Sequence, residues 1–579
     1  MKFLYNILMR YLILSFLLIV NTVDAQQSYI DYRSPFHPVV SSEGMVVSQS
    51  YLSSDIGVEI LNKGGNAVDA AVAVGFSLAI TLPRAGNIGG GGFMLVYLKE
   101  QEEIFFIDYR GKSPLNSNIK DLFNTNLPKD YKKTDFNKSR FGYKASTVPG
   151  TVAGLIDAHT NFGKLPLAEV LEPVIKQAEE GIIVSYDLSK AIESSKQLLK
   201  DPESKSIYFK DGKPLQENSL MKRPDLANTL RLIAKNGTKG FYEGETARKF
   251  IKAMEDNNGF MVEKDLKDYK INSGAPIVSL YRGHPVFTAG PPSGGGIVLL
   301  TALNVLGKYK FNKADSNSTR TYHLLAESLR RGHNNRSHHV GDPGFYDVPI
   351  DQLISEERTN ELKKNLKFKS ATPSDNVKPL SVVNESRDTT HYSIIDSDGN
   401  AVSNTYTLGY SFGSGVTIPG TGILMNNQMN NFAYRYGDTS IVGRAASPAN
   451  KFSPGKRPMS TMAPTMVFNK KGQLILITGS PGGSFIPAAV LRVVSGVIDF
   501  DLNIGEATML PRIHKDWPYA GLDYESTLSS DISNQLEYMG HQPERQKTMG
   551  STQSIHVING INYGYADLRR PNAGVSRQR

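Results

Sequence analysis

One internal stretch of the chain, residues 68–80 (VDAAVAVGFSLAI), is apolar at almost every position. Apolar side chains on nearly every face at helical spacing are typical of a helix buried between two layers. The stretch leads into four successive glycines at 89–92, whose backbone no side chain obstructs, so the segment suits tight packing or close approach to a ligand. No Gly-Lys-Ser/Thr sequence follows and the dinucleotide spacing is absent, so these glycines are not a phosphate loop.

The residues that follow predict strands first and helices later. Residues 94–97 and 104–110 are short apolar runs typical of strands. Between about residues 150 and 370 the pattern is helical, most clearly at 167–180 and 319–331, with turn-rich connections. This middle part is therefore predicted to be a helical half of the protein.

After about residue 381 the pattern changes and strands dominate. Residues 391–396 and 401–407 are predicted to form a hairpin, because Asp398-Gly399 lies in the turn between them. Further predicted strands and one helix lie at 422–426, 465–468, 474–478 and 488–498. Strands followed by helices indicate sheets covered by helices, an α+β fold, rather than a parallel βαβ series.

The N-terminal residues have the layout of a secretory signal peptide. Lys2 and Arg10 precede or border an apolar run at 12–20, and small residues at Val23 and Ala25 fit a cut after Ala25. Arg10 leaves the run short for a bilayer span, which argues against an uncleaved anchor, and no later stretch reaches about 18 uncharged apolar residues. We expect an exported protein, periplasmic or extracellular, with no stable membrane span after cleavage.

Composition and charge argue against several classes of function. The chain has 65 basic and 56 acidic residues, a net charge of +9, and its densest basic stretch, 330–339, is short and isolated. Nucleic-acid-binding proteins concentrate basic residues in a patch or stripe, so this class is not expected. The absence of cysteine excludes disulfides, thiolate metal sites and a cysteine nucleophile. His333, His338 and His339 lack metal-binding spacing and are predicted to be surface residues on or just after a helix, so we expect no metal and no cofactor.

Two segments offer a nucleophile. Ser411 lies in a Gly-x-Ser-x-Gly sequence, but a hydrolase elbow needs a helix directly after it, and here a glycine-rich loop follows. Thr389 follows Asp388 at the start of a predicted strand. A threonine at the N-terminus of a chain can use its own α-amine as the base, and that amine titrates near about 7.7–8. From these residues alone, an ordinary strand and a nucleophile released by cleavage both stay open.

Several longer motifs occur in order along nearly all of the chain after the signal. They lie at 65–70 (GNAVDA), 83–93 (PRAGNIGGGGF), 148–154 (VPGTVAG), 389–393 (TTHYS), 426–429 (NNQM), 456–460 (KRPMS) and 479–483 (GSPGG). Together they resemble the bacterial gamma-glutamyltransferase (glutathione hydrolase) family of the N-terminal nucleophile hydrolase superfamily. So many long motifs in one order are highly specific, and they favour the threonine hypothesis.

The resemblance implies a four-layer αββα sandwich built from two self-cleaved subunits. After the signal peptide, 1–25, the large subunit would be 26–388 and the small subunit 389–579, with the cut between Asp388 and Thr389. Thr389 would form a gamma-glutamyl ester that water or an amino-acid amine resolves. The implied partners are a glutathione-like gamma-glutamyl substrate, an amino-acid or peptide acceptor or water, and the other subunit of the heterodimer; no cofactor or metal is implied.

The resemblance also implies roles for the residues around the nucleophile. Thr407 would hydrogen-bond the Thr389 region and support its reactivity. Backbone N–H groups of Gly482 and Gly483 would form the oxyanion hole, a strong contribution in hydrolases.

The remaining implied contacts clamp the amino-acid end of the substrate. Arg110 would pair with the α-carboxylate, which a guanidinium can do bidentately. The hydroxyls of Ser460 and Thr461 would help hold that carboxylate, with threonine replacing the second serine of the family. Gln428 would face the α-amino group.

Two positions depart from the family pattern. The family usually reads Asn-Asn-Gln/Glu-Met-Asp-Asp-Phe, and this chain has Asn430 and Asn431 in place of the two acids. The second acid normally pairs with the substrate ammonium. Gly409 stands where many bacterial members place an asparagine that also contacts the amino group. A charge-assisted hydrogen bond contributes about 1.5–3 kcal/mol, so losing one predicts recognition weakened roughly 10- to 150-fold.

Three functions stay open. A gamma-glutamyl enzyme is favoured; an acylase that cleaves glutaryl or other dicarboxyl-type amides, as related cephalosporin acylases do, is the first alternative. The second is an exported, catalytically silent protein that binds amino-acid-like ligands. Residues 434–455, polar and containing glycine and proline, are expected to form a mobile loop over the site.

Overall fold

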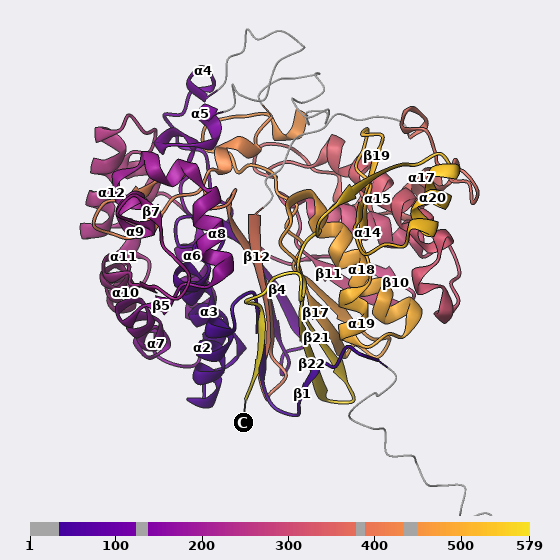
Figure 1. Cartoon of the computed structure of the whole chain (residues 1–579), viewed down its shortest axis with the longest axis horizontal. Coiled ribbons are helices and arrows are strands. Elements are labelled where there is room, and N and C mark those ends of the chain that lie inside the picture. The colour runs from indigo at the N-terminus through magenta and orange to yellow at the C-terminus, as the bar shows by residue number, and fades with distance from the viewer. Residues whose placement is uncertain (1–33, 123–136, 378–387, 434–447, 579) are drawn as a thin grey trace, which may run out of the picture.

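Two seven-stranded antiparallel sheets lie face to face in the middle of the molecule (Figure 1). The computed structural model describes residues 34–122, 137–377, 388–433 and 448–578. In spatial order, the first sheet contains β23 (Gly574–Arg577), β2 (Met45–Ser48), β12 (Asp388–Ile395), β13 (Ala401–Gly409), β3 (Gly91–Leu98), β4 (Glu103–Asp108) and β9 (Asn272–Gly274). The second contains β1 (Val39–Ser41), β22 (Ile561–Ala566), β21 (Gln553–Ile558), β17 (Leu474–Thr478), β16 (Thr465–Phe468), β11 (His284–Thr288) and β10 (Ile277–Tyr281).

Helices cover the outer face of each sheet and complete four layers. Those on the side of the first sheet include α2 (Tyr51–Asn62), α3 (Ala67–Thr81), α6 (Thr151–Phe162), α7 (Leu167–Glu180), α10 (Pro224–Asn236) and α12 (Gly244–Asp256). Those on the side of the second include α14 (Gly294–Leu306), α15 (Thr319–His339), α18 (Ile486–Phe500), α19 (Ile504–Met509) and α20 (Ser530–Tyr538). The expected α+β fold, an αββα sandwich, is confirmed.

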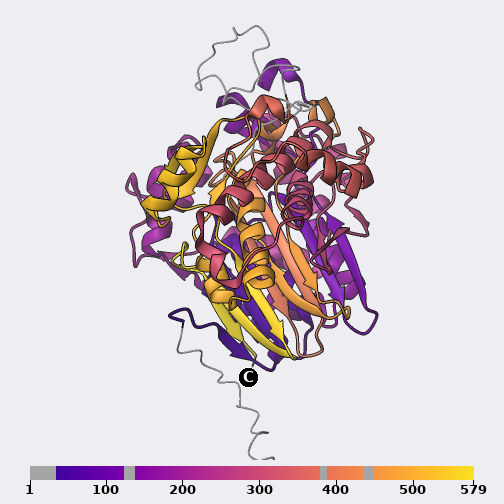
Figure 2. The same ribbon diagram turned by 90° about the vertical axis from the view of Figure 1, so that its right-hand side faces the viewer.

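Strands from distant parts of the sequence alternate within each sheet. Figure 2 shows early (indigo), middle (orange) and late (yellow) strands side by side. In the first sheet, β2 pairs with β12 on one side and with β23 on the other. In the second, β11 pairs with β16, and β1 pairs with β22. The two ends of the chain are thus built into the same two sheets.

The helix expected at 68–80 is α3, and every one of its residues is buried. Its first turn is held by a capping box, in which the Asn66 side chain accepts from Val68 N and Asp69 N while the Asp69 carboxylate accepts from Asn66 N. An all-apolar helix is stable only when protein surrounds it. Here the first sheet lies on one side of α3, and α2, α6 and α7 pack around the rest of it.

Local patterns predicted several elements with the observed bounds, namely α7, β16 and β17. The helix expected at 319–331 continues to His339, because Gly332 does not end it. A side chain at Gly332 would place its Cβ 2.5 Å from Val298 O, so the glycine allows close packing of α15 on α14. The single helical half expected at 150–370 is wrong: β9, β10 and β11 interrupt it and lead the chain from one outer layer to the other.

The basic stretch at 330–339 lies inside the protein, not on its surface. Arg331, His333 and His338 are buried, so the expectation of surface histidines is wrong for His333 and His338. His339, the last residue of the helix, is half-buried. Arg331 Nη1 lies 2.6 Å from a Glu327 carboxylate oxygen, and Arg330 lies 3.4 Å from the other. Arg330 and Arg331 are therefore paired within the core rather than offered to a polyanion.

Two expectations fall wholly or partly on residues that are not described. The signal peptide at 1–25 lies outside the described residues, as does the 434–447 part of the expected mobile loop. Within the described part of the chain, Gly483–Phe500 is long and apolar enough to cross a membrane, and 83% of it is buried in the protein. It is the core helix α18 with the turn before it.

Candidate active site

Thr389 lies at a break in the pairing of the two central strands of the first sheet. Asp388 pairs with Gly409 and Thr390 with Tyr406, so two residues of β13, Thr407 and Leu408, lie opposite the single residue Thr389, and the β-bulge is in β13. Bulges re-aim side chains and are over-represented next to active sites. Thr390 is completely buried, whereas Thr389 keeps 6% exposure. Thr389 thus lies opposite the bulge of β13, where strand pairing brings it next to Thr407.

His391, next but one in the chain, is a fixed polar contact in the core between the two sheets. Its Nε2 lies 3.0 Å from Ser393 Oγ, and Ser393 donates its own proton to Gln553 O at 2.9 Å. Ser393 must therefore accept from His391, which places the ring proton on Nε2 and leaves Nδ1 to accept from Thr405 Oγ1 at 2.8 Å. Burial lowers the pKa of His391 to about 3. The ring stays neutral and cannot act as the cation of a site.

Thr407 lies on β13, in the bulge. Its hydroxyl oxygen accepts from Gly409 N at 2.8 Å, and its carbonyl accepts from Gln428 Nε2 at 2.8 Å. Gly409 has a φ of +107°, and a Cβ there would lie 2.1 Å from Asn427 Oδ1. The glycine at 409 is therefore required by the backbone and by Asn427, whose Oδ1 in turn accepts from Tyr410 N. An asparagine at this position would not fit the observed conformation.

Gln428 begins a short helical turn, η7 (Gln428–Asn431), that lies between Thr407 and Arg110. At one end Gln428 bonds Thr407, as above, and accepts from Thr147 Oγ1 at 3.4 Å. At the other end Asn431 Oδ1 accepts from Arg110 Nη2 at 3.1 Å. Both η7 side chains are buried, so their positions are fixed relative to one another.

Arg110 follows the end of β4 and is 1% exposed. Its Nε donates to Pro458 O at 3.2 Å, and its backbone N–H donates to Asp108 Oδ1 at 2.8 Å. Burial raises the pKa of Asp108 to about 6, against the lowering effect of Arg457, whose Nε lies 3.4 Å away. The guanidinium is thus held between η7 and the Pro458 segment, with Asn431 in direct contact.

Ser460 and Thr461 lie between Arg110 and the glycine turn at 482–483. The Ser460 carbonyl accepts from Gly294 N, at the start of α14, at 2.6 Å, and its Oγ accepts from Met462 N at 3.2 Å. Thr461 Oγ1 donates to Gly483 O at 2.7 Å. The segment 458–461 therefore contacts Arg110 at one end and the glycine turn at the other.

Gly482 and Gly483 form that turn between β17 and α18. Their φ angles are +128° and +57°, a conformation that favours glycine. The turn passes through a 3-10 turn, Gly483–Phe485, directly into α18. N–H groups at a helix start lack intrahelical acceptors, and this end of a helix carries partial positive charge. The turn is suited to hold an oxyanion.

Strand pairing places Thr407 opposite Thr389. Hydrogen bonds link Thr407 to Gln428, Asn431 to Arg110, Arg110 to Pro458, and Thr461 to Gly483. Sequence reasoning missed Asn450, which is fully buried. Its Nδ2 donates to Asn431 O at 2.7 Å and its Oδ1 accepts from Met459 N at 2.9 Å. Asn450 thus holds residues 448–455, the described end of the expected mobile loop, against the site residues. No sequence motif marked Asn450.

The serine alternative lacks its structural context. Ser411 follows the end of β13, Phe412 has a φ of +56°, and a turn rather than a helix comes next. The Ser411 carbonyl accepts from Gln197 Nε2 at 3.0 Å. The expectation that this sequence is a glycine-rich turn is confirmed.

Comparisons with known proteins agree with this architecture. A family described as gamma-glutamyltranspeptidase matches residues 53–576. The glutathione hydrolase proenzyme of Escherichia coli (strain K12) is 40% identical, covering 94% of this chain and 93% of the relative. The acylase ACY 1 proenzyme of Pseudomonas sp. (strain SE83) is 34% identical, covering 91% and 92%.

Solved structures also align with this chain. A cephalosporin acylase from Bacillus halodurans aligns with a TM-score of 0.82 at 28% identity, covering 96% of this chain and 99% of that one. The gamma-glutamyltranspeptidase of Helicobacter pylori aligns with a TM-score of 0.53 at 36% identity, covering 57% and 93%. With the family match over most of its length and relatives at this identity, the chain belongs to the gamma-glutamyltranspeptidase family.

Proposed function

We propose that this protein is an exported gamma-glutamyl hydrolase and transferase that activates itself by cutting the bond between Asp388 and Thr389. The observation that carries the proposal is the position of Thr389 opposite the β13 bulge that contains Thr407, whose carbonyl bonds Gln428 of the same η7 turn that contacts Arg110. Relatives named proenzymes support the self-cleavage. Residues 1–25 would be removed as the signal, which supports delivery to a periplasm or to the outside of the cell.

In the proposed reaction, the cut gives Thr389 a free α-amine that serves as its base. The amine takes the hydroxyl proton while Oγ attacks the gamma-carbonyl, and the leaving amine receives that proton as the amide bond breaks. Water or an acceptor amine then attacks the ester and regenerates the hydroxyl. Thr407, fixed by Gly409 N and placed in the bulge opposite Thr389, would keep the nucleophile in line.

The turn at Gly482 and Gly483 would hold the oxyanion of each tetrahedral intermediate. Preorganised N–H donors of this kind contribute about 2.7–4 kcal/mol each. Arg110 would bind the α-carboxylate, with the Ser460 and Thr461 hydroxyls beside it. Gln428 and Asn431 would face the α-amino position from η7.

The two subunits, 26–388 and 389–579, would remain together after the cut as a heterodimer. The pairing of β12 with β2, and of β16 with β11, supports this, since both pairs join strands on opposite sides of the cut. Each half alone would expose the edges of two interrupted sheets, which is unfavourable.

An acylase for glutaryl-type amides is the second candidate, and one specific contact favours it. Asn431 is neutral and already accepts a hydrogen bond from Arg110, so the clamp holds a carboxylate without offering an anion to an ammonium. The acylase relatives support the same reading. Gamma-glutamyl and glutaryl anilides differ only in the α-amino group, and their relative rates distinguish the two candidates.

The first experiment is the intact mass, under denaturing conditions, of protein expressed with its signal. Two chains, one beginning at Gln26 and one at Thr389, are expected. Thr389→Ala should give one uncut, inactive chain, whereas Ser411→Ala should be cut and active. A single uncut wild-type chain would refute the proposal and leave a silent binding protein as the better description.

A further inference from the structure

A short segment of the small-subunit region, residues 549–552, packs against the turn that carries Gly482. We call it the backing segment, and residues 479–483 the oxyanion turn. A Cβ on Gly482 would lie 3.0 Å from Gly550 Cα, and a Cβ on Gly550 would lie 2.6 Å from Ser480 Oγ. Gly550 has a φ of +72°. Only glycines allow the two backbones to approach this closely, so the position of one fixes the position of the other.

Hydrogen bonds join the two segments on both sides of this contact. Ser551 N donates to Ser480 Oγ at 3.0 Å, and Ser480 Oγ donates to Pro481 O at 2.7 Å. Gln553 N donates to Gly479 O at 3.2 Å. The Ser480 hydroxyl is thus a bridge between the backing segment and the oxyanion turn.

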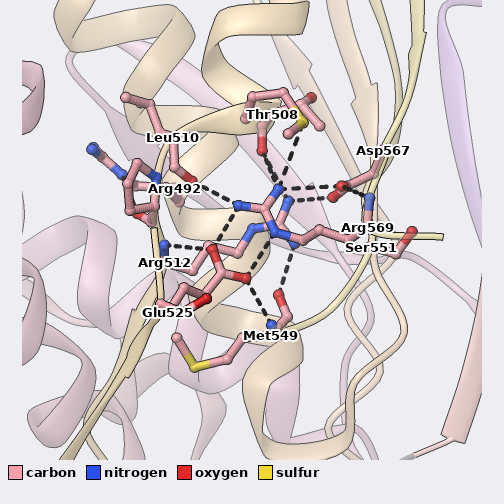
Figure 3. Close-up of polar contacts among 12 residues, drawn as sticks. Arg492, Thr508, Leu510, Arg512, Glu525, Met549, Ser551, Asp567 and Arg569 are labelled. Carbon is pink, nitrogen blue, oxygen red and sulfur yellow. Dashed lines mark hydrogen bonds and ion pairs between the residues drawn. The ribbon is translucent and has the colours of Figure 1, made fainter. Parts of the chain in front are cut away.

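Behind the backing segment lies a buried cluster of four charged side chains, shown in Figure 3. It consists of Arg512, Glu525, Asp567 and Arg569, whose side chains are 0%, 2%, 0% and 6% exposed. Arg512 Nη2 lies 2.6 Å from Asp567, and Arg569 lies 2.6 Å from Glu525 and 3.2 Å from Asp567. Burial by itself would raise the pKa of Asp567, but the two guanidinium groups outweigh it and lower the pKa. The carboxylate is held ionised.

The cluster holds the backing segment at both ends. Met549 O accepts from Arg512 Nη1 at 2.7 Å, and Met549 N donates to Glu525 Oε1 at 2.7 Å. At the other end, Thr552 N donates to Asp567 Oδ2 at 2.9 Å. Two backbone N–H groups and a carbonyl are therefore fixed by side chains that are themselves fixed by two arginines.

We infer that the Arg512–Asp567 cluster is a positioning device for the Gly482 and Gly483 amides, acting through the backing segment and the Ser480 hydroxyl. The inference rests on the proposed oxyanion role of this turn. A buried ion pair adds little net stability compared with apolar packing, whereas donors to an oxyanion must be held within about 0.5 Å of the productive geometry. A rigid charged support is suited to that requirement.

Two variants test the chain of contacts at different points. Ser480→Ala removes the bridge without disturbing the cluster, and Asp567→Asn removes the charge without changing the shape. Both should lower kcat by about 10-fold or more per active site, a fraction of the roughly 100- to 1000-fold that one oxyanion donor supplies. KM should stay within about threefold, because ground-state binding does not use these amides.

The readout that separates positioning from general damage is the affinity for a boronic acid analogue of the gamma-glutamyl group. It forms a tetrahedral adduct with the Thr389 hydroxyl, so its affinity should fall in parallel with kcat. Active sites are counted from the burst of anilide released on acylation, so unfolded or uncut protein does not enter the rate.

Glu327→Gln is the matched control. Glu327 is another fully buried carboxylate beside two arginines, Arg330 and Arg331, and burial opposed by these cations leaves its pKa at about 2. Its described hydrogen bonds go to Arg331 and to Thr372 N, away from the backing segment. This variant should lose stability but keep its kcat and its boronate affinity per active site.

Wild-type kcat and boronate affinity in Ser480→Ala would overturn the inference, whatever Asp567→Asn does. So would an equal loss of kcat in Glu327→Gln, or a fall in kcat with unchanged boronate affinity. Failure of the proposed function gives a different result, since the wild type itself would then release no anilide and form no adduct.

Discussion

The identity of residue 431 should control the choice between gamma-glutamyl and glutaryl substrates. Asn431 is 3% exposed and its Oδ1 lies 3.1 Å from Arg110 Nη2. Asn431→Asp changes one buried amide into a carboxylate at nearly the same shape. We expect this variant to favour substrates that carry an α-ammonium.

The magnitude follows from the position of the new charge. Unit charges about 4 Å apart interact by about 4 kcal/mol at an effective dielectric of about 20, so Arg110 would keep the introduced carboxylate ionised. An ionised acceptor for the substrate ammonium then contributes about 1.5–3 kcal/mol, which raises the gamma-glutamyl to glutaryl ratio of kcat/KM roughly 10- to 150-fold. The new carboxylate repels the α-position carboxylate of both substrates alike, so that effect cancels in the ratio.

The assay compares kcat/KM for gamma-glutamyl and glutaryl anilides in the wild type and the variant. Asn430→Asp is the matched control, because Asn430 is the adjacent residue but accepts from Ser139 Oγ at 3.2 Å. It adds the same charge and should leave the ratio near its wild-type value. A ratio unchanged in Asn431→Asp, or raised equally in the control, would refute the reasoning.

Three further predictions concern the clamp, the backbone beside the nucleophile and a buried lysine. Arg110→Lys should raise KM for both anilides about 10-fold or more with a smaller effect on kcat, because an ammonium cannot make the bidentate carboxylate pair. Steady-state kinetics measures both constants, and a change confined to kcat would contradict the prediction. Gly409→Ala should destabilise the protein by about 1–3 kcal/mol, because the φ of Gly409 is +107° and a Cβ would lie 2.1 Å from Asn427 Oδ1. Denaturant unfolding of the uncut Thr389→Ala chain, with and without Gly409→Ala, measures this difference. Equal free energies of unfolding in the two chains would count against it. Burial, aided by Arg330, lowers the pKa of Lys515 to about 7. Between pH 7 and about 10.5 the unfolded chain therefore binds a proton that the folded protein has released. The free energy of unfolding rises with pH in this window, by up to about 1.4 kcal/mol per pH unit. Lys515→Met in the same uncut chain should lack that rise, and an identical pH profile would exclude the shift.

Much of the local structure could be predicted because it depends on neighbours in sequence. The apolar pattern at 68–80 gave a buried helix, and β16, β17 and α7 were found with their observed bounds. The periodicity of side chains is a direct consequence of helix and strand geometry. The motif order along the chain was equally local, and it identified the family and the positions of the proposed nucleophile and clamp.

Other features could not be read from the sequence, because they depend on contacts between distant segments. The stretch 330–339 is as basic as a surface helix, and only packing against neighbours from other parts of the chain places it in the core. The β13 bulge opposite Thr389 arises from the pairing of β12 with β13, which no short window contains. Asn450 and the Arg512 cluster carry no motif; Asn450 contacts Asn431, and the cluster contacts residues 549–552 behind the glycine turn.

The sequence by itself therefore determined part of the secondary structure, the family and the kinds of residue available for chemistry. The tertiary structure decided how these residues meet: η7 joining Thr407 to Arg110, Thr461 joining the clamp to Gly483, and Gly409 made obligatory by Asn427. The physical reason is the distance along the chain over which each interaction acts. Hydrophobic periodicity and capping act over a few residues, whereas a site assembled from both outer regions of the chain is set by strand pairing and buried hydrogen bonds across more than 300 residues, as in the contact between Arg110 and Asn431.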